Sequence, residues 1–238
     1  MDNAEFVGAI ERSFIEFIKS GTSRSTRKLV PLHGAIACDM YERLGDGYLI
    51  QSQGFRNNKE GTIEGRYMDK KVDISVFRDL RPVCGIAVKF VMQNYSQNSN
   101  NYFENMLGET ANIRSAMCPY FQIFIIPERL PYYEKSGRFA HWETFSENNM
   151  HKYIVLDRDN PDQSFHSPNK TLIYVLRLPA TGRISCKDDY RQYYLDYFLK
   201  HGETGFVGVS SPVTFSNSVI LNDYNTFAQK VYHSIKAI

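Results

Sequence analysis

Two short β-type segments lie one after the other between residues 70 and 92, and each carries one ionisable residue among apolar neighbours. Asp73 interrupts the segment KKVDISVF, and Lys89 interrupts the segment VCGIAVKFVM. A charged group inside an apolar strand is costly unless another group pairs with it. We therefore expect the two segments to be neighbouring strands, on which the carboxylate and the ammonium either pair or hold a divalent metal and orient a water molecule.

The flanking segments predict an α/β fold. Apolar residues at helical spacing predict a helix over residues 33–44 that ends at Gly45, and a second helix from about 99 to 115. The continuous apolar run PYFQIFIIP predicts a buried strand. With GYLIQSQGF as the first strand, the order is helix, three strands, helix, strand. The first three strands form a meander, and the crossover through the second helix makes the fourth strand parallel to a neighbour, which gives a mixed sheet with helices packed on it.

The rest of the chain predicts an elaboration of this core within one domain over residues 1–238. Helical spacing of apolar residues begins the chain at 4–19 and ends it at 222–237. The core spans about 33–127 and a C-terminal α+β elaboration spans about 128–238. In the elaboration we expect helices at HWETFSENNMHKYI and KDDYRQYYLDYFLKHG, a strand at TLIYVLRLP and a polar loop at DRDNPDQSFHSPNK.

Composition limits the partners and the compartment. The formal net charge of the 238 residues is only +2, so a nucleic acid would have to bind to a local basic patch. No apolar run approaches the length of a membrane span, and the first residues do not form a signal peptide. We expect a cytoplasmic protein that does not enter a membrane.

Several common catalytic motifs are missing from the sequence. The four cysteines have no C-x-x-C spacing, and no histidine pair has the H-E-x-x-H spacing of zinc hydrolases. The chain also contains no G-x-S-x-G, Walker A or G-x-G-x-x-G motif. The sequence therefore predicts neither a zinc hydrolase, a serine hydrolase, a nucleoside-triphosphatase nor a dinucleotide-binding protein.

Asp73 and Lys89 on consecutive strands, within helix–three strands–helix–strand, resemble the PD-(D/E)XK nuclease superfamily, and within it type II restriction endonucleases. The resemblance covers about residues 33–127. It implies a restriction-endonuclease-like fold and Mg²⁺-dependent hydrolysis of phosphodiester bonds in double-stranded DNA at a specific sequence. It also implies that Asp73 binds the metal, that a second carboxylate completes the site, and that Lys89 steadies the attacking water. A metal lowers the pKa of bound water and neutralises charge that develops on the phosphate.

The sequence departs from the family pattern at Ala87, where the family has Asp or Glu two positions before the lysine. One explanation is that the second carboxylate has migrated to the following helix. The other two are an engineered inactive variant and a natural loss of activity, and either would leave a nuclease-like protein that binds DNA without cutting it. We favour migration because that helix carries acids.

Glu104 is the expected second carboxylate. Glu104 and Glu109 both lie at an edge of the apolar face of the predicted helix, at roughly 100° per residue. Glu104 is nearer the start of the helix, so we expect it to be nearer the end of the strand that carries Lys89. Glu109 and Glu64 are the alternatives. Glu60 and Glu64 lie upstream in the predicted hairpin and could face the site, and we favour Glu64 of the two.

Two polar segments are candidates for contact with DNA. The basic segment SRSTRKL could bind phosphates, although it is also consistent with a solvated loop. Asn and Gln in the run QNYSQNSNN could read adenine edges, and one of Asn98 and Ser99 is expected to cap the helix. A palindromic DNA site would favour a homodimer. The predicted DNA-binding residues are Arg24, Arg27, Lys28, Gln93, Asn94, Ser96, Gln97 and Asn98, and Arg158, Gln163, Asn169 and Arg191 are further candidates for base contact.

Overall fold

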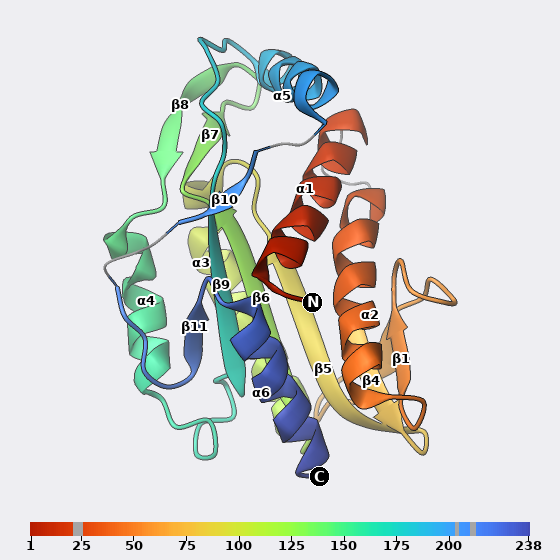
Figure 1. Ribbon diagram of the computed structural model, residues 1–238. Coiled ribbons are helices and arrows are strands. Elements are labelled where there is room, and N and C mark those ends of the chain that lie inside the picture. Colours follow the sequence, from red (N-terminus) through yellow and green to blue (C-terminus); the bar gives the residue numbers. More distant parts are fainter. Residues whose placement is uncertain (21–25, 203–204, 210–212) are drawn as a thin grey trace.

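The computed structural model describes residues 1–20, 26–202, 205–209 and 213–238 (Figure 1). Its centre is a mixed sheet of seven strands in the order β1-β4-β5-β6-β9-β10, with β11 pairing β9. β1 is antiparallel to β4 and β4 to β5, whereas β5, β6 and β9 run parallel. The sheet strands are β1 Leu49–Ser52, β4 Ile74–Arg78, β5 Arg81–Phe90, β6 Tyr120–Pro127, β9 Lys170–Arg177, β10 Val207–Gly208 and β11 Val219–Leu221.

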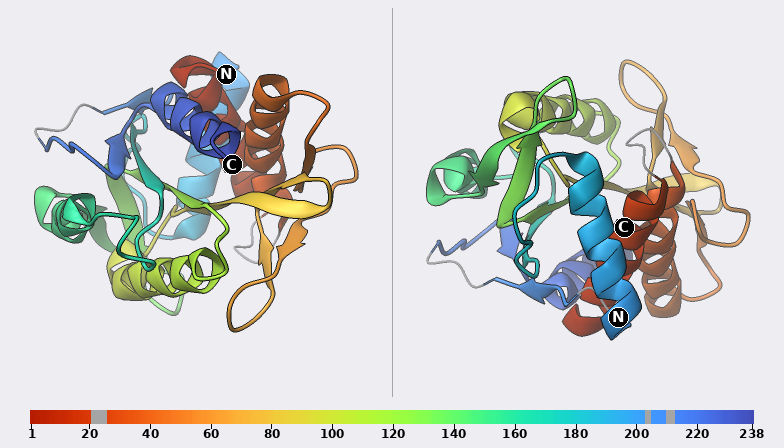
Figure 2. Two further views of the ribbon diagram at one scale, coloured as in Figure 1. Left: turned by 90° about the horizontal axis from the view of Figure 1, so that it is seen from below. Right: turned by 90° about the horizontal axis from the view of Figure 1, so that it is seen from above.

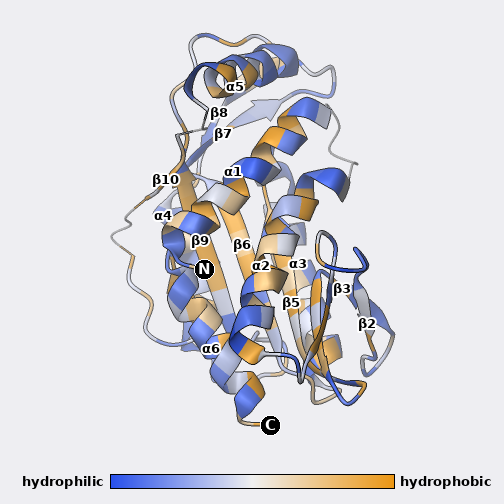
Figure 3. Ribbon diagram, turned by 45° about the vertical axis from the view of Figure 1, so that its right-hand side comes forward, coloured by the Kyte–Doolittle hydropathy of each residue, from blue (hydrophilic) through white to orange (hydrophobic). Residues whose placement is uncertain are grey.

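Helices cover both faces of this sheet, so the predicted α/β class with a mixed sheet is confirmed. α1, α2 and α6 pack on one face, and α3 and α4 pack on the other (Figure 2). The hydropathy colouring shows apolar residues along β5, β6 and β9, where the sheet is enclosed between these layers (Figure 3). The helical elements are α1 Asn3–Ser20, the 3₁₀ helix η1 Thr26–Leu29, α2 Val30–Leu44, α3 Tyr95–Arg114, α4 Glu147–Arg158, α5 Lys187–His201 and α6 Tyr224–Lys236.

Most elements form where the hydrophobic pattern predicts them. All eight residues of β6 are buried, as expected for a strand between two helical layers. α2 ends at Gly45, which has a φ of 82° and so adopts a conformation that favours glycine. β9 belongs to the expected C-terminal elaboration, yet it pairs with β6 and so extends the sheet of the core.

Three local predictions are wrong. The segment with Asp73 is divided, because Lys70–Val72 forms β3 and pairs with β2 (Gly61–Ile63), while Asp73 itself lies between β3 and β4. The segment predicted as a helix from His141 begins as a strand: β7 (Arg129–Tyr133) and β8 (Phe139–Thr144) form a hairpin before α4. The second core helix starts at Tyr95 and not near residue 98 or 99.

The early start of α3 has a long-range cause. The carboxylate of Glu143 on β8 accepts hydrogen bonds from the backbone N–H groups of Tyr95 and Ser96, at 2.7 and 3.0 Å. These are two of the donors that a helix leaves unpaired at its N-terminus. Glu143 therefore does the work expected of a local cap at Asn98 or Ser99, and sequence neighbours alone could not reveal it.

No helix within the described ranges is long and apolar enough to cross a membrane.

Arg114, at the end of α3, fastens the loop between α4 and β9 to the core. Its guanidinium is largely buried and donates hydrogen bonds to the backbone carbonyl oxygens of Pro161, Ser164 and Ser167. Because these carbonyl groups would lose a charged donor, we expect Arg114→Met to lower the free energy of unfolding by about 2–4 kcal/mol. Urea denaturation would measure the change, with the exposed Arg158→Met as the matched control. A loss below about 0.5 kcal/mol would contradict this role.

Candidate functional site

Asp73 lies at the junction of β3 and β4, beside the end of β5. The register that pairs Ile74 with Ile86 brings Asp73 next to β5, where its Oδ2 accepts a hydrogen bond from the Val88 N–H at 2.7 Å. The pKa of Asp73 is raised to about 6, chiefly by burial and in part by the nearby Glu109 carboxylate, against the opposing effects of the Val88 N–H, Lys89 and Lys70. A carboxyl group with a raised pKa in a pocket is typical of a functional site.

Lys89 and Glu109 line the same pocket, of about 210 Å³, as Asp73. Lys89 follows Val88 on β5, and its Nζ lies 4.3 Å from the centre of the Tyr102 ring. Partial burial lowers the pKa of Lys89, and the carboxylates of Asp73 and Glu109 act in the opposite direction. The predicted juxtaposition of Asp73 and Lys89 at neighbouring strands is therefore present.

The carboxylate at this pocket is Glu109 and not Glu104. Glu109 is half-buried, pairs with Lys70 of β3 and lies within 3.5 Å of the Tyr120 hydroxyl. Glu104 is exposed and lies outside the pocket lining, where its charge raises the pKa of Lys152 on α4 against the larger effect of burial. Five residues along a helix turn a side chain by about 140°, so the two acids lie at opposite edges of the apolar face of α3. The edge with Glu109 faces β5, which reverses the expected ranking.

Gln122 is a polar group at the pocket that sequence reasoning missed. It lies on β6, paired in register with Ala87, and both residues line the pocket. Its Nε2 is buried and has no hydrogen-bond partner within the described part of the chain. The sequence does contain a signal for Gln122, which is a polar amide within the apolar run PYFQIFIIP. A buried hydrogen-bond donor normally has an acceptor, so such a residue indicates a polar contact or a ligand. The unsatisfied N–H is suited to an anionic ligand in the pocket.

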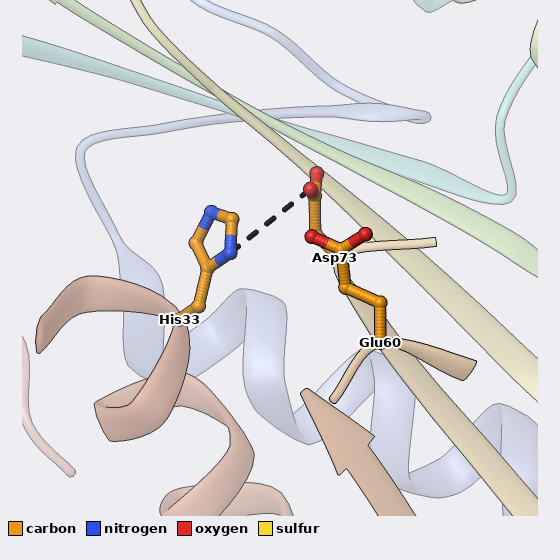
Figure 4. Close-up of side chains that lie close together, drawn as sticks. All are labelled: His33, Glu60 and Asp73. Carbon is orange, nitrogen blue, oxygen red and sulfur yellow. Dashed lines mark ion pairs between the residues drawn. The ribbon is translucent and has the colours of Figure 1, made fainter. Parts of the chain in front are cut away.

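A second group of side chains meets Asp73 from the α2 side. Figure 4 shows the His33 ring pointing toward the Asp73 carboxylate, with Glu60 beside it. His33 Nδ1 lies 4.0 Å from Asp73 Oδ1, and one ligand atom from each of the three residues lies within 4.8 Å of the others. These residues could hold a metal. Glu60 therefore takes the place expected for Glu64, which is exposed beyond the end of β2.

Two adjoining cavities extend from the Asp73 pocket. The first, of about 500 Å³, shares Lys89 and Tyr102 with the pocket. The second, of about 700 Å³, shares Gln93 and Lys187 with the first. We call the two together the cationic groove, because six basic and only two acidic side chains line it. The basic residues are Lys28, Lys89, Lys135, Arg138, Lys187 and Arg191, and the acidic ones are Glu134 and Asp188.

Three lysines of the cationic groove lie over aromatic rings. Lys28 Nζ is 5.6 Å from the centre of the Phe17 ring, and Lys187 Nζ is 5.4 Å from that of Tyr133. Lys89 over Tyr102 is the third pair. Both acids of the groove form ion pairs with its arginines, Glu134 with Arg138 and Asp188 with Arg191. The lysines therefore dominate its electrostatic potential.

The predicted DNA-binding residues divide into three sets. Lys28, Gln93, Asn94, Gln97 and Asn98 line the cationic groove. Exposed Arg27 and Ser96 are outside that lining, and Arg24 lies outside the described residues.

One of these side chains, and two of the suggested base readers, have structural contacts. Asn94 exchanges hydrogen bonds with the Tyr133 backbone, and Asn169 accepts one from the Tyr120 N–H. Arg191 lines the groove and donates to the Ile18 carbonyl. Arg158 and Gln163 are exposed and do not line the groove.

No protein-family model, curated protein or solved structure matches this chain.

Proposed function

We propose that the protein is a divalent-metal-dependent nuclease that hydrolyses phosphodiester bonds of double-stranded DNA, with a restriction-endonuclease-like core. The observation that carries this proposal is the position of Lys89, which lines both the Asp73 pocket and the cationic groove. A phosphodiester backbone that follows the groove would bring one phosphate to Lys89 and Asp73. Regularly spaced negative charge is the ligand that a lysine-lined groove suits best.

The order of the elements supports the same assignment. α2, β1, β4, β5, α3 and β6 follow one another in the order of the resemblance, interrupted only by the small β2–β3 hairpin. The meander of β1, β4 and β5 is antiparallel, and the crossover through α3 makes β6 parallel to β5. Sequence-specific cleavage of the type II restriction class, with a homodimer on a palindromic site, is the form of this activity that we propose.

Each pocket residue has a role in that reaction. The Asp73 carboxylate is suited to a cation because the Val88 N–H anchors one oxygen and leaves the other available. A bound Mg²⁺ or similar ion would lower the pKa of water and neutralise charge on the phosphate. Lys89 would stabilise the attacking hydroxide and a phosphate oxygen, and Gln122 Nε2 would donate to the phosphate. Glu109 also lines the pocket, where its carboxylate is paired with Lys70.

A DNA-binding protein without cleavage is the second candidate. Ala87 lines the pocket where the family pattern has a metal-binding acid, and Glu109 is already paired with Lys70. The cationic groove would then hold DNA beside a pocket that cannot assemble a metal centre.

Incubation of phage or plasmid DNA with the purified chain separates the two candidates. The nuclease is expected to give discrete fragments with Mg²⁺ or Mn²⁺ and none with EDTA, and to sediment as a dimer. DNA binding without cleavage under either metal would favour the second candidate. No binding and no cleavage would reject both.

The cationic groove predicts which lysines bind the backbone. We expect Lys187→Glu to weaken DNA binding by about 1–2 kcal/mol at low salt, or roughly five- to thirtyfold, because an exposed positive charge is reversed. The matched control is Lys236→Glu. This change also removes an ammonium group that lies over a tyrosine ring, that of Tyr48, but Lys236 is on α6 and does not line the groove. Fluorescence anisotropy at several salt concentrations measures both. Equal losses in the two variants would show that only net charge matters.

A further inference from the structure

His33 is a buried histidine whose ring nitrogens lack the contacts that such a group needs. Its side chain is 1% exposed, and neither Nδ1 nor Nε2 has a hydrogen-bond partner within the described ranges. A neutral imidazole has one donor and one acceptor nitrogen, and burial of either without a partner is unfavourable. Either ring nitrogen of an imidazole can serve as a ligand to a metal ion.

Two carboxylates from different parts of the chain converge on this ring. Asp73 presents Oδ1 toward His33, because the Val88 N–H holds Oδ2. Glu60, in the segment before β2, is held by a hydrogen bond of 2.8 Å from Gln53 Nε2. Support of this kind orients the ligands of metal sites. Figure 4 shows the resulting arrangement, with Asp73 and Glu60 beside the Nδ1 edge of the ring.

The spacing of the three groups fits one ion after a small contraction. Atoms that all lie within 4.8 Å of one another share a central point that is no more than about 2.8 Å from each. Bonds from first-row metals to His nitrogen and carboxylate oxygen are about 2.0–2.2 Å long. Each ligand atom would therefore move by at most about 0.6–0.8 Å, within the range of side-chain adjustment.

The donor set distinguishes between classes of metal. Mg²⁺ prefers oxygen ligands and keeps several waters, whereas imidazole suits first-row transition metals. A cation on the other side of Asp73 would have to displace Lys70 from Glu109. The cation site with a neutral nitrogen donor and two carboxylates is on the α2 side.

We propose that His33, Glu60 and Asp73 form a binding site for one divalent first-row transition-metal ion, such as Mn²⁺, which binds there in preference to Mg²⁺. As the metal centre of DNA hydrolysis the site rests on the proposed function, but as a binding site it does not. Glu109 stays paired with Lys70 and is not a ligand.

Calorimetric titration of the EDTA-treated full chain with MnCl₂ and with MgCl₂ tests the site. We expect one Mn²⁺ per chain and Mg²⁺ binding at least about tenfold weaker. His33→Gln and Glu60→Gln should each weaken Mn²⁺ binding by at least about tenfold, whereas Glu109→Gln and the exposed Glu64→Gln should leave it unchanged. Thermal unfolding in EDTA checks that each variant folds. Glu60 is half-buried and in a loop, so its variant remains informative if His33→Gln fails to fold.

Three outcomes would overturn the proposal. They are no Mn²⁺ binding, a loss of binding with Glu109→Gln but not with Glu60→Gln, and Mg²⁺ binding as tight as Mn²⁺. Failure of the proposed function is separate: Mn²⁺ bound through His33 and Glu60 without DNA cleavage would reject the nuclease alone. Mn²⁺ binding and DNA cleavage that His33→Gln and Glu60→Gln both leave intact would reject the metal site alone.

Discussion

Asp73→Asn is expected to reduce the rate of DNA cleavage by about three orders of magnitude or more. Asp73 lines the pocket with Lys89 and also belongs to the group formed with His33 and Glu60. Its replacement therefore removes a metal ligand whichever of these two groups of residues binds the metal. A metal contributes several kcal/mol to stabilising the transition state, and about 4 kcal/mol corresponds to a thousandfold change in rate. Single-turnover cleavage with saturating enzyme measures the chemical step directly.

The matched control for Asp73→Asn is Glu104→Gln. Glu104 is exposed on α3 outside the pocket, so its replacement also removes one carboxylate charge but should change the rate by less than about twofold. A large loss in Glu104→Gln would restore Glu104 as a metal ligand. Retention of more than a tenth of the activity in Asp73→Asn would remove Asp73 from the mechanism.

Asp73→Asn is expected to lose activity but to gain stability, so a loss of cleavage in this variant could not be explained by misfolding. Because burial raises the pKa of Asp73 from 3.8 to about 6 in the folded chain, the ionised carboxylate destabilises the metal-free fold at higher pH. This penalty is absent below about pH 4 and complete above about pH 6. In EDTA, Asp73→Asn should therefore be more stable than the wild type by about 1–3 kcal/mol at pH 7.5, and equally stable near pH 3.5. Urea denaturation at the two pH values measures this difference.

Lys89→Met is expected to lower the rate of the chemical step by about 10²- to 10⁴-fold, with a smaller effect on DNA affinity. Its ammonium lies at the pocket with Asp73 and Glu109, where it would stabilise the attacking hydroxide. Methionine keeps most of the apolar length of the side chain but removes the charged Nζ that lies over Tyr102.

Lys28→Met supplies the comparison for Lys89. Lys28 lines the cationic groove but not the Asp73 pocket, and the charge of Lys89 is close enough to lower its pKa, after the larger effect of burial. Its replacement should raise KM and leave kcat nearly unchanged. Equal effects of the two variants on kcat would mean that Lys89 only binds the backbone.

The local hydrophobic pattern of the sequence was sufficient to predict those elements whose apolar residues are continuous or recur at helical spacing. The apolar run of β6, the amphipathic helix α2 and the pairing of the strand that follows Asp73 with the strand that carries Lys89 were all predictable. In each case the elements that pack together are neighbours in the chain, so the hydrophobic pattern and chain connectivity specify the contact.

The choice of carboxylate depended on tertiary packing. Glu104 and Glu109 lie at opposite edges of the apolar face of α3, and the sequence does not say which edge faces β5. That edge is decided by how the helix lies on the sheet, with Glu143 of β8 holding its first turn. Lys70 and the Tyr120 hydroxyl then contact the Glu109 carboxylate and hold it at the pocket.

His33 shows the limit of motif reasoning most clearly. Its partners Glu60 and Asp73 come from two other segments, so no spacing within α2 could identify it as a ligand. The sequence by itself determined the α/β layers, the central strands and the pairing of β4, which follows Asp73, with β5, which carries Lys89, because these follow from local periodicity and short connections. Only the tertiary structure decided which acids and which histidine surround Asp73, because side chains distant in the chain meet according to helix orientation and the division of β3 from β4.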